Sequence, residues 1–265
     1  MIAAVMVMIL VAMSYASNIL DARLAENEFS ANKQFMLTTG LQIDDVAWTV
    51  GRTQTITYSS RSGFVRFENL SLQYTVVLHY NNGNPNETII SNVPTGMVMY
   101  NMPISMYNMG NNYFQRVSPV NNASFLQQGP TAPVGHVLIV ERLPMDDGSF
   151  IRIVAVPTIR TLDSSIAGPS PSTSTVYCKF FLPTLISSSD NSALSQSITM
   201  VGNDVTKIIR RDVDQVKITV GYPSAATGLN STFFGFAHNV ETKNLPSGSV
   251  VEFYVGKVIV SVGQV

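Results

Sequence analysis

The first twenty residues constrain this chain more than any other stretch. They read MIAAVMVMILVAMSYASNIL and contain no charged residue, no proline and no glycine. A helix of that length spans about 30 Å, which matches the hydrocarbon core of a bilayer. Charged residues begin immediately afterwards with Asp21, Arg23 and Glu26. The pattern therefore predicts a helix that is long and apolar enough to cross a membrane.

The helical pattern continues beyond this apolar run. The first glycine is Gly40 and the first proline is Pro85. Apolar residues recur mostly in steps of three, four or seven, which places them on one helix face: Ala25, Phe29, Met36, Ile43, Ala47 and Val50. We predict one helix over residues 1–50, apolar all round in its first half and amphipathic in its second, with Gly51 as its stop.

A secretory signal peptide is the alternative interpretation of the N-terminal run. Such a peptide carries basic residues before a shorter apolar core and a small-residue cleavage site after it. No Lys or Arg precedes the apolar run in this chain, and the next segment continues as helix. We therefore expect that a short basic leader has already been removed from the chain.

From Thr53 onward the periodicity changes to two. Runs such as TQTITY, LSLQYTVVLHY, HVLIVERL and VVEFYVGKVIVSV are rich in β-branched and aromatic residues, which is typical of strands. Turn sequences separate them, among them residues 80–85 and the predicted hairpin turn at 145–148. We predict an α+β chain: the helix, then an antiparallel β-sandwich over residues 51–265. The Ser-rich stretches 161–175 and 186–197 are interpreted as long loops within one domain.

Composition excludes some partners. Only 12% of the residues are charged and the net charge is −1, so the chain has no basic surface for nucleic acid. Cys178 is the only cysteine, which rules out an intrachain disulfide. Its surroundings, VYCKFF, resemble a strand, and this favours a buried packing thiol over a reactive one.

The residues that commonly carry chemistry form no recognisable motif. His79, His136 and His238 lie in separate predicted strands without metal-ligand spacing, and there is no HExxH, CxxC, GxSxG or phosphate-binding loop. Asp212 and Asp214 follow two arginines, and they are interpreted as a solvent-facing strand paired with them rather than as a calcium site. Asp44 and Asp45 are adjacent on the helix, point about 100° apart and are expected to face solvent or pair with a base such as Arg52. We expect no enzyme activity, no cofactor and no metal.

Two surface features remain. Residues 96–114 contain five methionines and four aromatic residues, which suits either an adaptable contact surface or an irregular core. Four N-x-S/T sequences lie in or beside predicted turns and are candidate glycosylation sites if the protein is extracellular: Asn69, Asn86, Asn122 and Asn230.

The N-terminal segment of the chain resembles a known family. The apolar start MIAAVMVMILVAMSYASNIL, its continuation DARLAENEFSANKQF and the following β domain without catalytic motifs look like archaeal type IV pilin-like proteins, which include adhesion pilins and archaeal flagellins. The motif-level resemblance covers about the first 50 residues. Position 1 is Met1 and position 5 is Val5, where bacterial pilins have an aromatic residue and a glutamate. The start also lacks the glycine common in archaeal flagellins, which favours an adhesion-type pilus.

The resemblance implies an extracellular structural subunit of a helical filament. A leader peptidase would process the chain, and the helix would span the membrane before assembly. The assembly machinery would then transfer the subunit into a homopolymer with helices in the core and β domains outside. Burying the apolar helix removes on the order of 2,000 Å² from water, worth tens of kcal/mol before entropic costs. The residues expected in the filament core are Ile2, Val5, Val7, Ile9, Leu10, Val11, Met13, Leu20, Leu24, Phe29 and Met36.

Two other functions fit the same sequence. One is a subunit of an archaeal flagellar filament. The other is a single-pass membrane-anchored surface glycoprotein whose β domain binds a ligand as a monomer. An anchored β-rich enzyme is disfavoured because no catalytic constellation is present.

Overall fold

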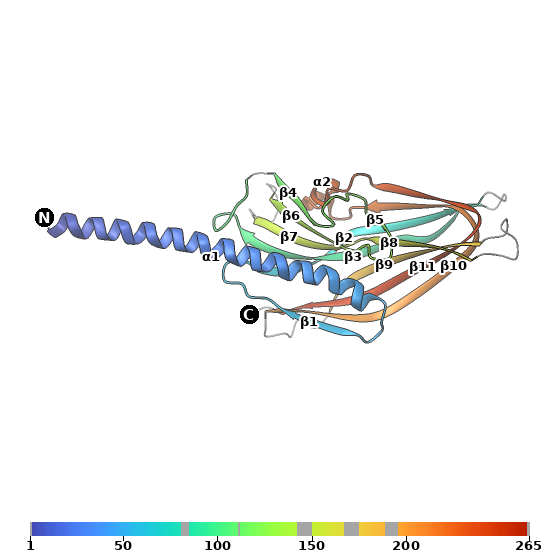
Figure 1. Cartoon of the computed structure of the whole chain (residues 1–265), viewed down its shortest axis with the longest axis horizontal. Coiled ribbons are helices and arrows are strands. Elements are labelled where there is room, and N and C mark those ends of the chain that lie inside the picture. Colours follow the sequence, from blue (N-terminus) through green and yellow to red (C-terminus); the bar gives the residue numbers. More distant parts are fainter. Residues whose placement is uncertain are drawn as a thin grey trace.

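A computed structural model of the chain describes residues 2–80, 85–110, 112–141, 150–166, 175–188 and 196–263. Its most prominent element is α1 (Ile2–Ala47), one uninterrupted helix of 46 residues, or about 70 Å at 1.5 Å per residue. Its N-terminal half projects beyond the rest of the molecule (Figure 1). The predicted long helix is therefore confirmed, although it ends at Ala47 instead of near residue 50.

The helix ends early because the chain turns there toward the sheet. Thr49 donates its N–H to the carbonyl of Val46 at 3.3 Å, and Arg52 donates to Thr49 at 3.1 Å. Gly51 has a φ of +81°, a conformation that favours glycine, and its N–H reaches the carbonyl of Gly202 at 2.7 Å. The predicted stop residue thus makes the turn that leads into the first strand.

The remainder of the chain is almost entirely β structure, which we call the β domain. Two short helical segments lie near its C-terminal end, η2 (Ala225–Thr227) and α2 (Ser231–Phe234). Its strands are β1 (Thr53–Thr57), β2 (Phe64–His79), β3 (Glu87–Pro103), β4 (Tyr113–Ser118), β5 (Leu126–Gln128), β6 (Gly135–Glu141), β7 (Phe150–Pro157), β8 (Ile159–Ile166), β9 (Thr175–Ser187), β10 (Ser197–Gly221) and β11 (Val240–Val262).

All of these strands belong to one 11-stranded sheet in the order β4-β6-β7-β3-β2-β10-β11-β9-β8-β5, with β1 also paired to β10. The α+β class is confirmed, but the sheet is mixed and not purely antiparallel as predicted. β11 runs parallel to β9, and β5 runs parallel to β8. The β9–β11 pair is parallel because β10 lies between these strands in the sequence and carries the chain back, so that β11 inserts between β9 and β10.

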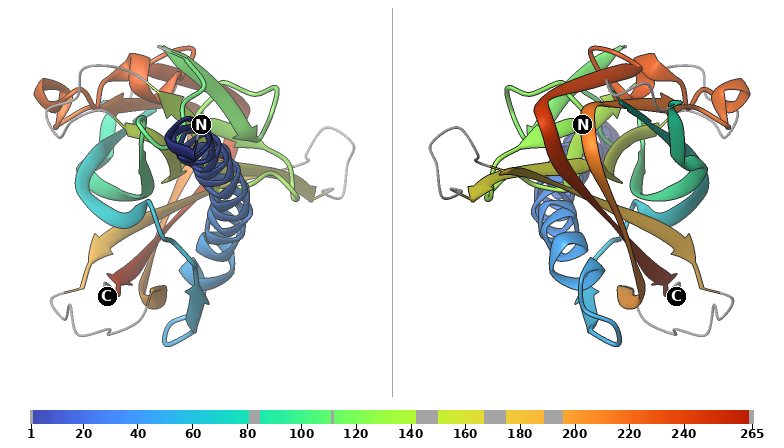
Figure 2. Two further views of the ribbon diagram at one scale, coloured as in Figure 1. Left: turned by 90° about the vertical axis from the view of Figure 1, so that its left-hand side faces the viewer. Right: turned by 90° about the vertical axis from the view of Figure 1, so that its right-hand side faces the viewer.

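The sheet curls strongly, as the end-on views show (Figure 2). Strands from its two halves thereby meet. The N–H of Leu185 in β9 donates to the buried hydroxyl of Thr95 in β3 at 2.9 Å. Within one half of the sheet, the hydroxyl of Tyr74 in β2 also donates to the carbonyl of Pro157 in β7, two strands away, at 2.9 Å. The two-layered arrangement that a sandwich requires is thus made here by one folded sheet.

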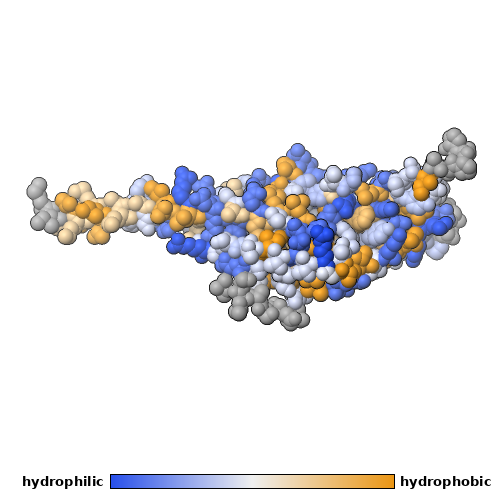
Figure 3. Space-filling model, turned by 60° about the horizontal axis from the view of Figure 1, so that its bottom comes forward, coloured by the Kyte–Doolittle hydropathy of each residue, from blue (hydrophilic) through white to orange (hydrophobic). Residues whose placement is uncertain are grey.

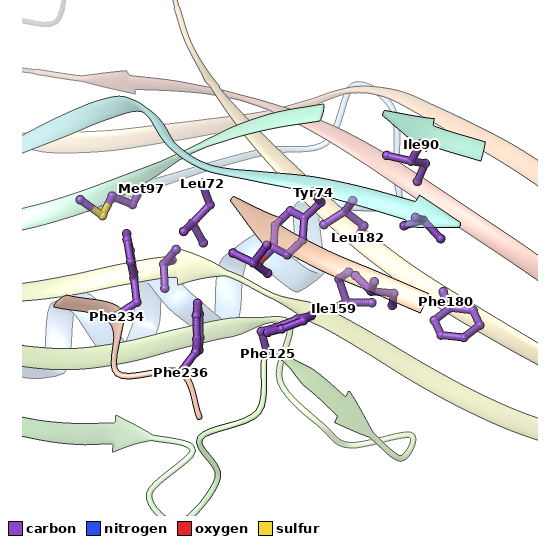
Figure 4. Close-up of a cluster of buried hydrophobic side chains, with 14 of the residues drawn as sticks. Leu72, Tyr74, Ile90, Met97, Phe125, Ile159, Phe180, Leu182, Phe234 and Phe236 are labelled. Carbon is purple, nitrogen blue, oxygen red and sulfur yellow. The ribbon is translucent and has the colours of Figure 1, made fainter. Parts of the chain in front are cut away.

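The curled sheet separates two apolar cores. The first lies inside the curl and is rich in aromatic rings, including Tyr74, Phe125, Phe234 and Phe236 (Figure 4). The second lies between α1 and the other face of the sheet and contains Phe29, Met36 and Ile43 from the helix. Alternate residues of a strand serve the two cores: in β3, Met97 and Met99 face the first, and Val98, Tyr100 and Met102 face the second.

Several segments differ from the sequence prediction. Residues 161–166, expected in a loop, continue β8, and 186–187 end β9. The stretches GFVRFE and LSLQYTVVLHY form one strand, β2, with an irregularity between Glu68 and Leu72 where Leu70 has a φ of +54°. The predicted turn at 145–148 lies outside the described residues, but β6 and β7 on either side of it pair antiparallel.

Candidate functional site

The N-terminal half of α1 is the largest exposed apolar surface of the described structure. Every residue from Ala3 to Leu24 is exposed. The large side chains in it, from Val5 through Leu10 and Tyr15 to Leu24, keep between 41% and 69% of their surface in contact with solvent. Figure 3 shows the hydrophobic colour on the projecting helix and a mixed surface over the β domain. Exposed apolar surface of this extent marks a site of association or membrane insertion.

Most residues predicted for the filament core lie on this exposed half. They are Val5, Val7, Ile9, Leu10, Val11, Met13, Leu20 and Leu24. The side chain of Ile2 lies outside the described part of the structure. Phe29 and Met36 are placed differently: they are 4% and 0% exposed because they pack against the β domain of their own chain. They therefore have no free surface to offer to a neighbouring helix.

The change from exposed to buried occurs at Ala25, the first buried residue of the helix. From there the helix lies close to the sheet. A Cβ on Gly135 of β6 would lie 2.5 Å from the carbonyl oxygen of Gly40, and a Cβ on Gly256 of β11 would lie 2.4 Å from that of Ala47. The absence of side chains at these positions lets the helix backbone approach the strands directly.

One carboxylate joins the helix to the β domain near this boundary. Glu28 of α1 accepts hydrogen bonds from the hydroxyls of Ser60 at 2.7 Å and Tyr100 at 2.9 Å. It also accepts the backbone N–H groups of Arg61, Ser62 and Gly63 at 3.0–3.1 Å. We call this arrangement the Glu28 site. The segment between β1 and β2 thereby wraps around a single side chain of the helix.

The local sequence suits this geometry. A Cβ on Gly63 would lie 2.3 Å from the hydroxyl of Tyr100, so the site requires glycine there. Asn32, one turn further along α1, donates to the carbonyl of Ser59 at 3.1 Å and holds the start of the same segment. Burial raises the pKa of Glu28, but the hydrogen bonds from Ser60, Ser62, Tyr100 and Gly63 outweigh it and lower the pKa below its usual value.

The C-terminal end of α1 is also held by charges. Asp44 accepts from Arg160 of β8 at 2.6 Å and from the indole N–H of Trp48 at 2.7 Å. Asp45 pairs with Arg52, as the sequence analysis proposed. The two carboxylates thus point to different partners and form no catalytic pair.

The candidate chemical residues are scattered. His79 ends β2, His136 is buried in β6, and His238 is exposed. Burial and then the charge of Arg116 lower the pKa of His136 to about 3, so it stays neutral at ordinary pH. Within the described ranges, no three His, Cys, Asp or Glu side chains gather closely enough to hold a metal ion.

Two further predictions concern Cys178 and the Asp212–Asp214 pair. Cys178 is fully buried in β9, as expected, and burial followed by a hydrogen bond with Asp163 raises the pKa of its thiol to about 12. Asp212 is exposed in β10, but Arg210 does not pair with it. Its guanidinium instead binds the carboxylate of Glu87 through contacts of 2.6–2.9 Å, so the predicted pairing of Arg210 with Asp212 is wrong.

The methionine-rich segment divides in two. Met97, Met99 and Met102 are buried in β3 and fill both cores, whereas Met106 and Met109 are 41% and 39% exposed in the loop after it. The core interpretation is therefore confirmed for the methionines of β3, and the contact interpretation stays a prediction for Met106 and Met109. Sequence periodicity did not find this division because β3 is buried on both faces.

The four glycosylation candidates differ in accessibility. Asn69, Asn86 and Asn230 are exposed, whereas Asn122 is half-buried. The side-chain amide of Asn122 donates to Gln127 at 2.8 Å, and its oxygen accepts the N–H of Ser124 at 2.9 Å. The oxygen of Asn230 caps α2 by accepting the N–H groups of Thr232 and Phe233.

The chain was compared with protein-family models, with curated proteins and with solved structures, and none of the three comparisons found a match.

Proposed function

We propose that this chain is the structural subunit of an extracellular, helical, type IV pilus-like filament that serves surface attachment. The projecting halves of α1 bundle in the filament core and the β domains form the outer sheath. Before assembly the same helix holds the subunit in a membrane. The proposal depends on one observation: a continuous helix is exposed on all sides from Ala3 to Leu24 and packed into its own β domain from Ala25 onward.

The energetics support association over a soluble monomer. Fully burying a large aliphatic side chain contributes about 1.5–3 kcal/mol, so covering the exposed half of α1 is worth on the order of tens of kcal/mol before entropic costs. A helix that is apolar all round requires neighbours on every side. One partner covers only one side, and repeated contacts that do not close into a ring produce a helical filament.

Two leucines on the same helix offer a matched test. Leu10 on the projecting half is 65% exposed, and Leu41 on the packed half is 63% exposed. We expect that Leu10→Glu abolishes fibres seen by electron microscopy after detergent removal, because it places a charge in the apolar core. Leu41→Glu should leave fibre yield unchanged, because this residue faces solvent at the β domain. Fibres of normal yield from Leu10→Glu would refute the proposal.

A single-pass membrane-anchored surface protein is the second candidate. Its support is that α1 is long and apolar enough, by length and composition, to cross a membrane. Mechanical shear of intact cells distinguishes the two functions. A filament subunit is released in sedimentable fibres, whereas an anchored monomer stays with the membrane fraction until detergent is added.

A further inference from the structure

Exposed apolar side chains gather at the end of the β domain from which α1 projects. Met106 and Met109 belong to the loop after β3, and Phe64 begins β2; they are 41%, 39% and 41% exposed. Tyr107 lies between the two methionines. We call these four residues the collar. Both β3 and the segment before β2 reach the helix at this end of the molecule (Figure 1).

Two contacts with α1 place the collar along the helix axis. The ring of Tyr107 lies 4.9 Å from that of Phe29 of α1. Phe64 directly follows Gly63, whose N–H binds Glu28. The collar therefore lies beside residues 28–29 of the helix, next to the last turns before it leaves the β domain.

The collar loop is held in place. Its Met109 N–H donates to the buried carboxylate of Glu141 at 2.6 Å, and its Met106 N–H donates to the carbonyl of Pro103 at 3.0 Å. Phe64 packs edge-on against Phe150 at 5.6 Å. The exposed side chains are thus presented by an ordered backbone.

The spacing along α1 relates the collar to the apolar run. Leu20 ends the charge-free stretch, and Phe29 is nine residues further, or about 13 Å at 1.5 Å per residue. When residues 1–20 fill the hydrocarbon core, Phe29 lies about 13 Å outside it, beyond a headgroup layer that is roughly 5–8 Å thick. Glu26, whose charge acts on Tyr107, lies about 9 Å outside the core, at the outer edge of that layer. Collar side chains that reach a few ångströms toward the N-terminus then meet the headgroups.

We propose that the collar rests on the headgroup layer of the membrane while the apolar half of α1 spans it. This inference depends on the membrane-inserted state within the proposed function. The chemistry fits an interface, where tyrosine is enriched because its ring is apolar and its hydroxyl is polar. The exposed Arg61 in the Glu28 site lies at the same end and suits a lipid phosphate, whereas Arg23 on α1 is paired with Glu26 at 2.8 Å.

The collar borders the exit of the helix, and the charged residues Asp21, Arg23 and Glu26 lie between it and the apolar run. This position favours a lipid surface over a second protein copy, because a bilayer that the anchor enters lies across the helix axis on this side of the β domain. The membrane contact then sets how deeply the subunit sits before it is taken into a filament.

The test uses the full chain in lipid nanodiscs that hold one copy each, with bimane attached to one introduced cysteine. Three variants are compared: Met106→Cys in the collar, Met13→Cys in the anchor, and Ile209→Cys as the control. Ile209 is 45% exposed, much like Met106, but adjoins Arg210, which binds Glu87 at the opposite end of β3. The native Cys178 is buried and is not expected to react. Quenching is measured with nitroxides on lipid headgroups and, separately, on acyl chains.

We expect headgroup nitroxides to quench the Met106 probe at least threefold more than the Ile209 probe, and acyl-chain nitroxides to quench the Met13 probe. If Met13 is quenched and Met106 is no more quenched than Ile209, the collar inference is wrong and the proposed anchor stands. If Met13 is not quenched, the membrane-inserted state itself fails. If the Met106 probe changes only in discs with several copies, the collar contacts a second copy and the lipid assignment is overturned.

Discussion

The hydroxyl of Tyr100 donates a hydrogen bond of 2.9 Å to the carboxylate of Glu28, although 72 residues separate them in the sequence. The bond joins the C-terminal part of β3 to the helix just after the point where the helix surface changes from exposed to buried. If the chain assembles as proposed, force applied to the β domain would reach the filament core through this region of α1. The Glu28 site therefore holds the first packed turns of the helix to the domain.

Replacing Glu28 tests how much this site contributes. Glu28→Gln removes the charge and turns an amide group toward several donors, so we expect the free energy of unfolding to fall by about 1–3 kcal/mol. Glu26→Gln is the control, because Glu26 pairs only with the exposed Arg23 at 2.8 Å and should change stability by less than about 1 kcal/mol. The measurement is the denaturant midpoint of the full chain in detergent micelles. Equal midpoints for the two variants would contradict the assigned role.

The lowered pKa of Glu28 predicts an acid-dependent loss of stability. A carboxylate whose folded pKa lies below its unfolded value, about 4.3, stabilises the fold above the unfolded pKa, and this contribution disappears as the pH falls through the folded pKa. We expect the stability difference between the natural chain and Glu28→Gln to be full near pH 6 and to shrink below about pH 4. The measurement is the unfolding midpoint of both proteins across that range. A difference that stays constant down to pH 2 would show that the charge is unimportant.

The close approach of helix and sheet predicts a steric effect at Gly135. In Gly135→Ala the new methyl meets the backbone of Gly40 at 2.5 Å, and backbone cannot rotate away, so we expect a loss of about 2–3 kcal/mol. Gly40→Ala instead meets a methyl group of Val137 at 2.8 Å. Adding Val137→Ala should relieve that second clash but leave the first. The measurement is the thermal unfolding midpoint of the single and double variants. An unchanged midpoint for Gly135→Ala would mean that the helix moves freely on the sheet.

The four sequons should differ in occupancy if glycans are added to the folded chain. Asn122 uses both its amide nitrogen and its oxygen in internal hydrogen bonds, whereas Asn86 is exposed at the start of β3. We expect glycopeptide mass spectrometry of the protein from its natural source to find Asn86 occupied more often than Asn122. Full occupancy of Asn122 would indicate that sugar is attached before folding.

Cys178 should be chemically silent in the folded chain. Its thiol is buried and its pKa is raised to about 12, so almost no thiolate is present at pH 8. We expect less than one-tenth of the molecules to react with a maleimide in an hour, and complete reaction after denaturation. Rapid labelling of the folded protein would mean that β9 opens readily.

The sequence by itself determined the elements whose signals are local. A charge-free run of twenty residues, followed by apolar residues at helical spacing, can be read without knowing what surrounds it, and Gly51 marks the end of the helix. Alternating apolar residues likewise predicted most of the strands and hence the α+β class. The buried character of Cys178 also followed from its strand-like neighbours.

Tertiary structure alone decided which parts meet. Three features depend on contacts between distant segments. They are the parallel pairing of β9 with β11, the burial of Phe29 and Met36 within their own chain, and the ion pair between Arg210 and Glu87. The same is true of Glu28, which resembles any other helix-surface glutamate until the 59–63 segment folds around it. Such contacts depend on how the sheet curls. The curvature results from many weak interactions between distant residues, and a local sequence pattern does not reveal these.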